Sequence, residues 1–140
     1  MKLIKIKAIQ DLCACLGSDG CYTLCLILVA EKITKKDIDV IRVTRKLIDN
    51  NFIDYDDKRP RAYTNTMYVK DADKVLKMLG CVGYRIRKVS ELPEGYNGYY
   101  IERHSLNGNT HFTLPDYNTL TDSKCVREGR ITAYYLVEKV

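Results

Sequence analysis

The sequence lacks the segments that would carry a protein into or across a membrane. Its one continuous apolar run, residues 21–30, is too short to cross a bilayer and is closed by Glu31 and Lys32. The alternating Lys, Leu and Ile of residues 1–9 do not form the apolar stretch and small-residue cleavage site of a signal peptide. These absences predict a cytoplasmic protein with no membrane partner.

The patterns typical of repeat and nucleic-acid-binding proteins are also scarce. The chain has no internal repeat, no low-complexity tract and no tryptophan, and its eleven tyrosines assign no function by themselves. The net charge of +5 is mild, and the short basic stretch at residues 58–61 is of the kind that usually lies solvated in a loop. We therefore expect no nucleic-acid partner.

The cysteines lack the spacing of a structural zinc site. They occur as C-x-C and C-x3-C rather than as the C-x2-C pairs of zinc ribbons, and without an export signal reduced thiols are expected. An alternative is a metal site made by Cys21, His104, His111 and Asp122, but these ligands come from distant segments. The sequence thus predicts no metal and no cofactor. The six cysteines lie at positions 13, 15, 21, 25, 81 and 125.

Helical patterns occupy the first half of the chain. A run from Cys21 to about Lys32 is apolar on nearly all sides, which is typical of a helix buried in the middle of a domain. Thr34 is expected to cap a second helix that ends near residues 50–51, and Asp71 a third, shorter one. The second helix would place two sets of side chains next to each other: Ile38, Ile41, Arg45 and Ile48 on roughly one stripe, with Val40, Val43 and Leu47 beside it.

The second half of the chain has the alternation of β-strands. Strands are expected within residues 82–89, 98–104, 110–114 and 131–138, with another short one that reaches about Asp122. Asn107-Gly108 is a strong signal for a two-residue hairpin turn. Helices followed by an antiparallel sheet predict the α+β class, in a single domain that spans residues 1–140.

Two segments ninety residues apart have the residue types of a thiol site. Cys21 opens the buried helix after a glycine-rich turn, and His111 lies much later on a predicted strand. The positive end of a helix lowers the pKa of a thiol, and a nearby imidazole takes up the proton that the thiol releases. Cys25, one turn further along, is expected to belong to the core.

Strand register adds an acid to this pair. If Asn107-Gly108 are the central residues of the hairpin turn, His104 pairs opposite His111, nearer the rim. If Asp116-Tyr117 are central in the next turn, His111 pairs opposite Asp122. Opposed side chains share one face with Cβ atoms ~5 Å apart, so Asp122 would orient the His111 ring. Asp116 is the alternative third residue.

These residues also carry a family resemblance. The chain resembles a group of small phage and spirochaete-plasmid proteins of unknown function, which are similar to papain-like (bacteriocin-peptidase-like) cysteine peptidases. The resemblance implies a papain-like fold with a nucleophile at Cys21, a base at His111 and an acid after it. The segments that carry it are Gly20-Cys21-Tyr22, Ala30-Glu31, Ile53-Asp54, residues 67–71, His111-Phe112-Thr113-Leu114, Ser123, Val126 and Gly129-Arg130-Ile131.

The sequence therefore predicts a papain-like thiol hydrolase. Cys21, His111 and Asp122 would transfer an acyl group from an amide or thioester, and a peptide or protein is the expected substrate. One alternative is an inactive papain-like fold that binds a partner. Another is a winged-helix-like module over residues 34–69 that binds nucleic acid, with residues 58–61 as its basic wing.

Overall fold

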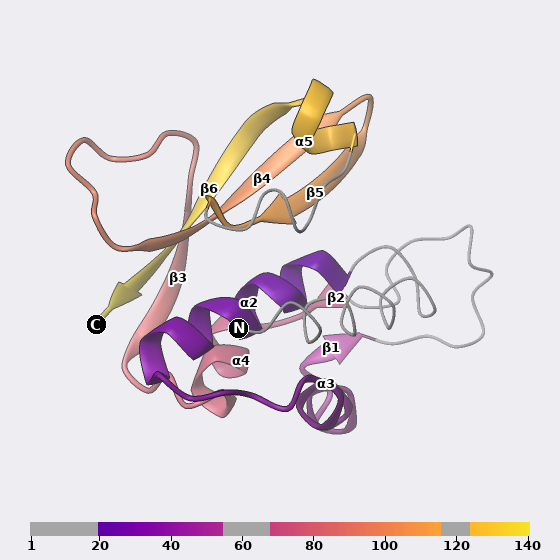
Figure 1. Ribbon diagram of the computed structural model, residues 1–140, viewed down its shortest axis with the longest axis vertical. Coiled ribbons are helices and arrows are strands. Elements are labelled where there is room, and N and C mark those ends of the chain that lie inside the picture. Colours follow the sequence, from indigo (N-terminus) through magenta and orange to yellow (C-terminus); the bar gives the residue numbers. More distant parts are fainter. Residues whose placement is uncertain (1–19, 55–67, 116–123) are drawn as a thin grey trace. The chain divides into compact units, whose positions relative to one another are not determined.

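The computed structural model describes residues 20–54, 68–115 and 124–140 (Figure 1). Helices and an antiparallel sheet are both present, which confirms the α+β class. The chain divides into two compact units, residues 1–82 and residues 83–140, and a single papain-like domain stays a prediction. The helices are α2 (Gly20–Thr34), α3 (Val40–Asp49), α4 (Ala72–Met78) and α5 (Lys124–Glu128). The strands are β1 (Ile53–Asp54), β2 (Tyr68–Val69), β3 (Tyr84–Val89), β4 (Tyr99–Leu106), β5 (Asn109–Thr113) and β6 (Arg130–Lys139).

Helix α2 is buried on all sides, as its continuous apolar sequence predicts. Every residue from Leu24 to Ala30 is at most 2% exposed. The helix ends where Lys35 adopts a positive φ of 59° and donates its backbone N–H to Glu31 O at 2.9 Å. None of the described helices is long and apolar enough to span a membrane.

Helix α3 starts later than the sequence predicts. Thr34 belongs to the end of α2, and Asp39 is the residue that caps α3, because its carboxylate accepts the backbone N–H of Arg42 at 3.2 Å. Of the two neighbouring stripes expected on this helix, the one through Ile41 and Arg45 faces solvent, since Ile41 is 64% exposed and Arg45 is exposed as well. A neighbouring stripe with the same helical spacing faces the core instead: Val40, Thr44 and Leu47.

The choice between these stripes has a physical reason. Both have helical spacing, but burying the stripe that contains Arg45 would take its guanidinium out of water without a buried partner. In the structure this guanidinium lies at the surface, 3.8 Å from the exposed Asp49 carboxylate.

The rest of the first unit follows the sequence closely. Asp71 caps α4 by accepting the Lys74 backbone N–H at 3.1 Å, and Gly80 ends it with a φ of 96°. Strands β1 and β2 pair antiparallel, with Ile53 opposite Val69. Helix α2 contacts both β2 and α4, so this unit packs around its most apolar helix.

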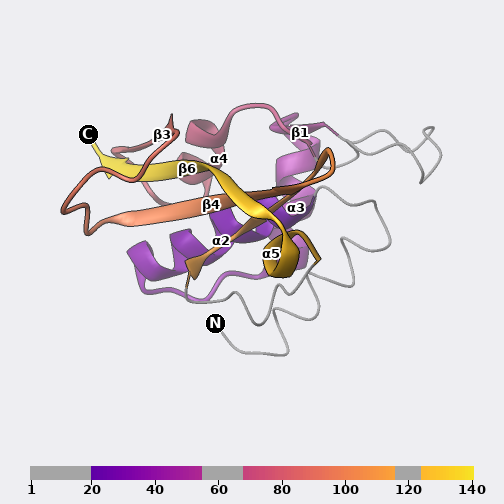
Figure 2. The same cartoon turned by 90° about the horizontal axis from the view of Figure 1, so that it is seen from above.

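The second unit is an antiparallel sheet with the strand order β3-β6-β4-β5 (Figure 2). The β4–β5 turn is the predicted hairpin, because Asn107 and Gly108 both have positive φ, at 50° and 83°. The last strand, β6, lies between β3 and β4 and pairs with each. Strand β4 is therefore an inner strand of the described sheet.

A β-bulge interrupts the pairing of β4 with β6. Arg103 is opposite Ala133 but His104 is opposite Ile131, so Thr132 is an extra residue on β6. The Thr132 hydroxyl accepts from Arg103 Nε at 2.9 Å and lies 2.8 Å from the Ser105 hydroxyl. The bulge thus directs Thr132 to the sheet face of Arg103 and Ser105.

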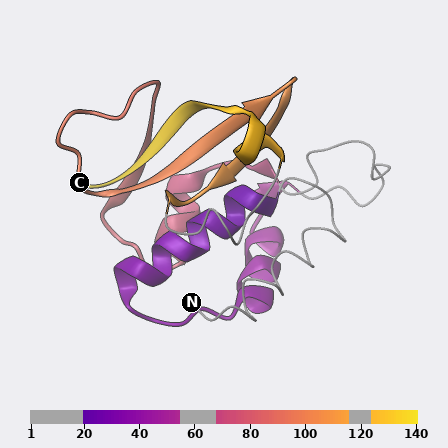
Figure 3. The same ribbon diagram turned by 45° about the horizontal axis from the view of Figure 1, so that its top comes forward.

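Helix α5, which the sequence analysis did not predict, contacts β4 and β5 (Figure 3). It leads directly into β6 through Gly129. A Cβ at Gly129 would collide with the carbonyl oxygens of Cys125 and Ser105, so only glycine lets the chain pass this close to β4.

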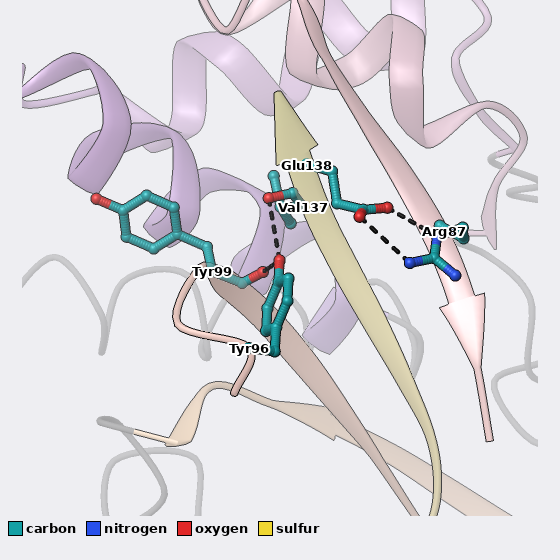
Figure 4. A network of polar contacts seen from close by, with 5 residues as sticks. All are labelled: Arg87, Tyr96, Tyr99, Val137 and Glu138. Atoms are coloured by element: carbon teal, nitrogen blue, oxygen red, sulfur yellow. Dashed lines mark hydrogen bonds and ion pairs between the residues drawn. The ribbon is translucent and has the colours of Figure 1, made fainter. Parts of the chain in front are cut away.

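Hydrogen bonds of Tyr96 and an ion pair between Arg87 and Glu138 connect the strands at the end of the sheet where β6 finishes (Figure 4). The Tyr96 hydroxyl lies 2.8 Å from Tyr99 O and 3.4 Å from Val137 O, which fastens the β3–β4 connection to two strands. On β3 and β6, Arg87 Nε donates to Glu138 at 2.8 Å. This hydrogen bond from Arg87 lowers the pKa of the Glu138 carboxyl.

Candidate thiol–histidine site

Cys21 is the second residue of α2 and its side chain is half-buried. From Thr23 to Ala30 every residue of the helix is buried, so α2 meets its surroundings at its two ends, and Cys21 lies at the first of them. A thiol in the first turn lies among backbone N–H groups that have no partner within the helix, and these groups favour a negative charge. This position is the one that the sequence predicts for Cys21.

Cys25 lies one turn further along the same side of α2 and is fully buried. Its burial, with a smaller contribution from the charge of Cys21, raises the pKa of the Cys25 thiol well above its ordinary value. Burial raises the pKa of Cys81 too. Of the four described cysteines, the half-buried ones are Cys21 and Cys125.

The two histidines of the chain lie directly opposite each other. The β4–β5 register pairs His104 with His111, which confirms the cross-strand pair expected from the Asn107-Gly108 turn. The expected place of His104 near the rim is wrong, because β4 is an inner strand and His104 is only 6% exposed. His111, on β5, is half-buried.

The His104 imidazole is buried, and this burial disfavours its charged form. Within the described part of the chain, its Nε2 atom is buried and has no hydrogen-bond partner. Burial, and to a lesser extent the charge of His111, lowers the pKa of His104 from its ordinary value of 6.5. The bulge contributes to this setting, because it places Ile131 opposite His104 and turns the Thr132 hydroxyl toward Ser105 on the other face.

Glu102 is a buried carboxyl that the sequence analysis did not single out. It lies two residues before His104, on the same face of β4, and is 8% exposed. Burial raises the pKa of Glu102, and among the described residues no cation forms an ion pair with it. Alternation in β4 places it beside His104, but only its inner position in the sheet buries it.

Other members of the predicted site lie outside the described residues. These are Asp116 and Asp122, together with the turn before Cys21 and the basic stretch at 58–61. Cys21 belongs to the first compact unit and His111 to the second, and their pairing stays a prediction. In residues 20–54, 68–115 and 124–140, no three His, Cys, Asp or Glu side chains are grouped to hold a metal ion.

Comparisons with family models, with curated proteins and with solved structures give no match to this chain. The assignment of the candidate site is therefore based on the chemistry of its own residues.

Proposed function

We propose that this chain is a papain-like thiol hydrolase that acts on an amide or thioester of a peptide or protein. Cys21 is the nucleophile and His111 the base, with Asp122 or Asp116 as the residue that orients the imidazole. The observation that carries the proposal is the half-buried thiol of Cys21 in the first turn of a helix whose middle, residues 23–30, is buried.

The chemistry is acyl transfer in two steps. His111 takes the proton from Cys21 Sγ, the thiolate attacks the carbonyl carbon, and the C–N or C–S bond breaks as the leaving group takes that proton. Water, deprotonated by His111, then hydrolyses the acyl-cysteine and restores the thiol. The Cys21 backbone N–H, at the positive end of the helix, is the proposed donor to the oxyanion of each tetrahedral intermediate.

Burial supports Cys21 over its neighbour as the nucleophile. Cys25 is fully buried, and ionising both thiols of this helix would place two negative charges one turn apart. Cys81 is buried as well. Cys21 has both the exposure and the helix-terminal position that a reactive thiol needs.

The test is the pH dependence of alkylation at Cys21. Iodoacetamide labelling, followed by peptide mapping, is measured from pH 5 to 10 for the intact protein. We expect the labelling of Cys21 to have a midpoint below the ~8.5 of an unperturbed cysteine, and the His111→Gln substitution to move that midpoint upward.

Cys125 is the matched control within the same chain. It too is half-buried and is the second residue of a helix, but α5 has five residues and α2 has fifteen. Because α5 contacts β5, the labelling of Cys125 in His111→Gln reports any general effect of the substitution, and the upward shift at Cys21 is expected to exceed the change at Cys125. A Cys21 midpoint that His111→Gln does not move would show that the two residues do not form a catalytic pair.

A binding module is the second candidate, because α3 presents three exposed cations: Arg42, Arg45 and Lys46. The antiparallel β1–β2 pair follows this helix, as in a winged-helix arrangement. The charge of +5 argues against tight binding of nucleic acid. Sub-micromolar duplex binding that weakens steeply with salt, and that the triple alanine variant of these residues loses, would favour this candidate over the hydrolase.

A further inference from the structure

The two histidines of this chain form one titrating pair. As directly opposed residues of antiparallel strands, His104 and His111 have Cβ atoms about 5 Å apart. Two positively charged imidazole rings on such neighbouring residues repel each other. The second proton therefore binds to the pair less readily than the first. The question is which ring holds the first proton.

The surroundings of the two rings differ. His104 is buried, with only 6% of its surface exposed, whereas His111 on β5 is half-buried. A charged imidazole loses its hydration when it is buried, so the buried ring is the weaker base. In the described part of the chain, no hydrogen-bond partner at Nε2 offsets this loss for His104.

Among the described residues, no acid next to His104 reverses this order. Glu102 on β4 and Tyr134 on β6 share the sheet face of His104. Helix α5, which contacts β4, carries Lys124, Cys125, Arg127 and Glu128. Among the described residues, it is the charge of His111 that acts on His104. The β6 residue opposite His104 is the apolar Ile131.

We propose that His104 is a positioning residue that stays neutral and thereby confines the proton of the pair to His111. Its role rests on the proposed function, in which the proton released by Cys21 Sγ must be held on the ring that faces the thiol. If His104 took this proton instead, the negative thiolate would lose the adjacent imidazolium. Neutral His104 prevents that, because its buried site disfavours the charge.

The chain has only two histidines, so proton NMR resolves the order of protonation directly. The two imidazole Hε1 signals are assigned with the His104→Gln and His111→Gln variants and are followed from pH 8 to pH 4.5. We expect His111 to titrate first. In His111→Gln, the titration of His104 should move to higher pH, because the opposing charge is gone.

Glu102→Gln is the matched control, since Glu102 lies on the same strand and face as His104. It is expected to leave the order of protonation unchanged. Protonation of His104 before His111, or a His104 titration that His111→Gln does not move, would overturn the proposal.

These outcomes are separate from those that test the hydrolase. If Cys21 proves inert while His111 still titrates first, the proposed function fails and the order of protonation stands. If His104 titrates first while Cys21 remains activated, the inference fails and the hydrolase stands. Intact tertiary structure of each variant is checked by the dispersion of the same NMR spectra.

Discussion

Alanine substitution should affect α2 and α3, the two longest helices in the described part of the chain, in different ways, because the middle of α2 is buried on every side and α3 on one. Leu26 and Leu28 are separated by about 200° around a helix, so an amphipathic helix would expose one of them. Both are at most 1% exposed in α2. In α3, by contrast, Ile41 is 64% exposed.

The expected magnitudes follow from this burial. Leucine to alanine removes three carbons, about 2.4 kcal/mol at roughly 0.8 kcal/mol for each buried carbon, and the cavity left behind brings the loss to 2–5 kcal/mol, in order of magnitude. We expect this loss for both Leu26→Ala and Leu28→Ala. For Ile41→Ala about a third of the transfer term applies, and the higher helix propensity of alanine offsets roughly half of it, so the change should be below ~0.5 kcal/mol.

The assay is urea unfolding followed by far-UV circular dichroism, with the free energy taken from the midpoint and the m-value. Ile41→Ala is the control, because it is also a substitution to alanine within a helix but at an exposed position. A loss below ~1 kcal/mol for either leucine variant, at an unchanged m-value, would mean that one side of α2 is open to solvent. The rigid placement of Cys21 by a buried helix would then lose its basis.

Three further predictions concern individual residues. Asp39→Ala should lower the free energy of unfolding by about 1 kcal/mol in the same assay, because α3 loses the acceptor of the Arg42 backbone N–H, and Asp39→Ser should restore most of it. Gly108→Ala should lower it by ~1 kcal/mol or more, since the turn needs a φ of 83°, and an unchanged unfolding midpoint would argue against this turn. The lowered pKa of His104 means that the unfolded chain binds more protons below pH 6.5, so stability is fully present above that pH and falls as the pH is reduced. Thermal unfolding at pH 7.5 and pH 5 should show a smaller pH effect for His104→Gln than for the unsubstituted chain, and equal effects would contradict the assignment.

Local sequence determined most of the helices and strands, and it also determined the pairing of the two histidines. The apolar run after Gly20 has no polar side, so it had to form a buried helix, and Asn107-Gly108 suits only a turn with two positive φ angles. Because a two-residue turn sets every pair outward from it, the opposition of His104 and His111 follows from the sequence alone.

Tertiary structure decided what local patterns leave open. Two stripes of α3 have the same spacing, and packing selected the one without Arg45, whose charge must stay in water. Strand β6 entered the sheet between β3 and β4, which made β4 an inner strand and buried Glu102 and His104. The local sequence does not predict this strand order, because the order depends on contacts between residues far apart in the chain. Burial, and with it the unequal basicity of the two histidines, is thus a property of the folded sheet rather than of the sequence around each ring.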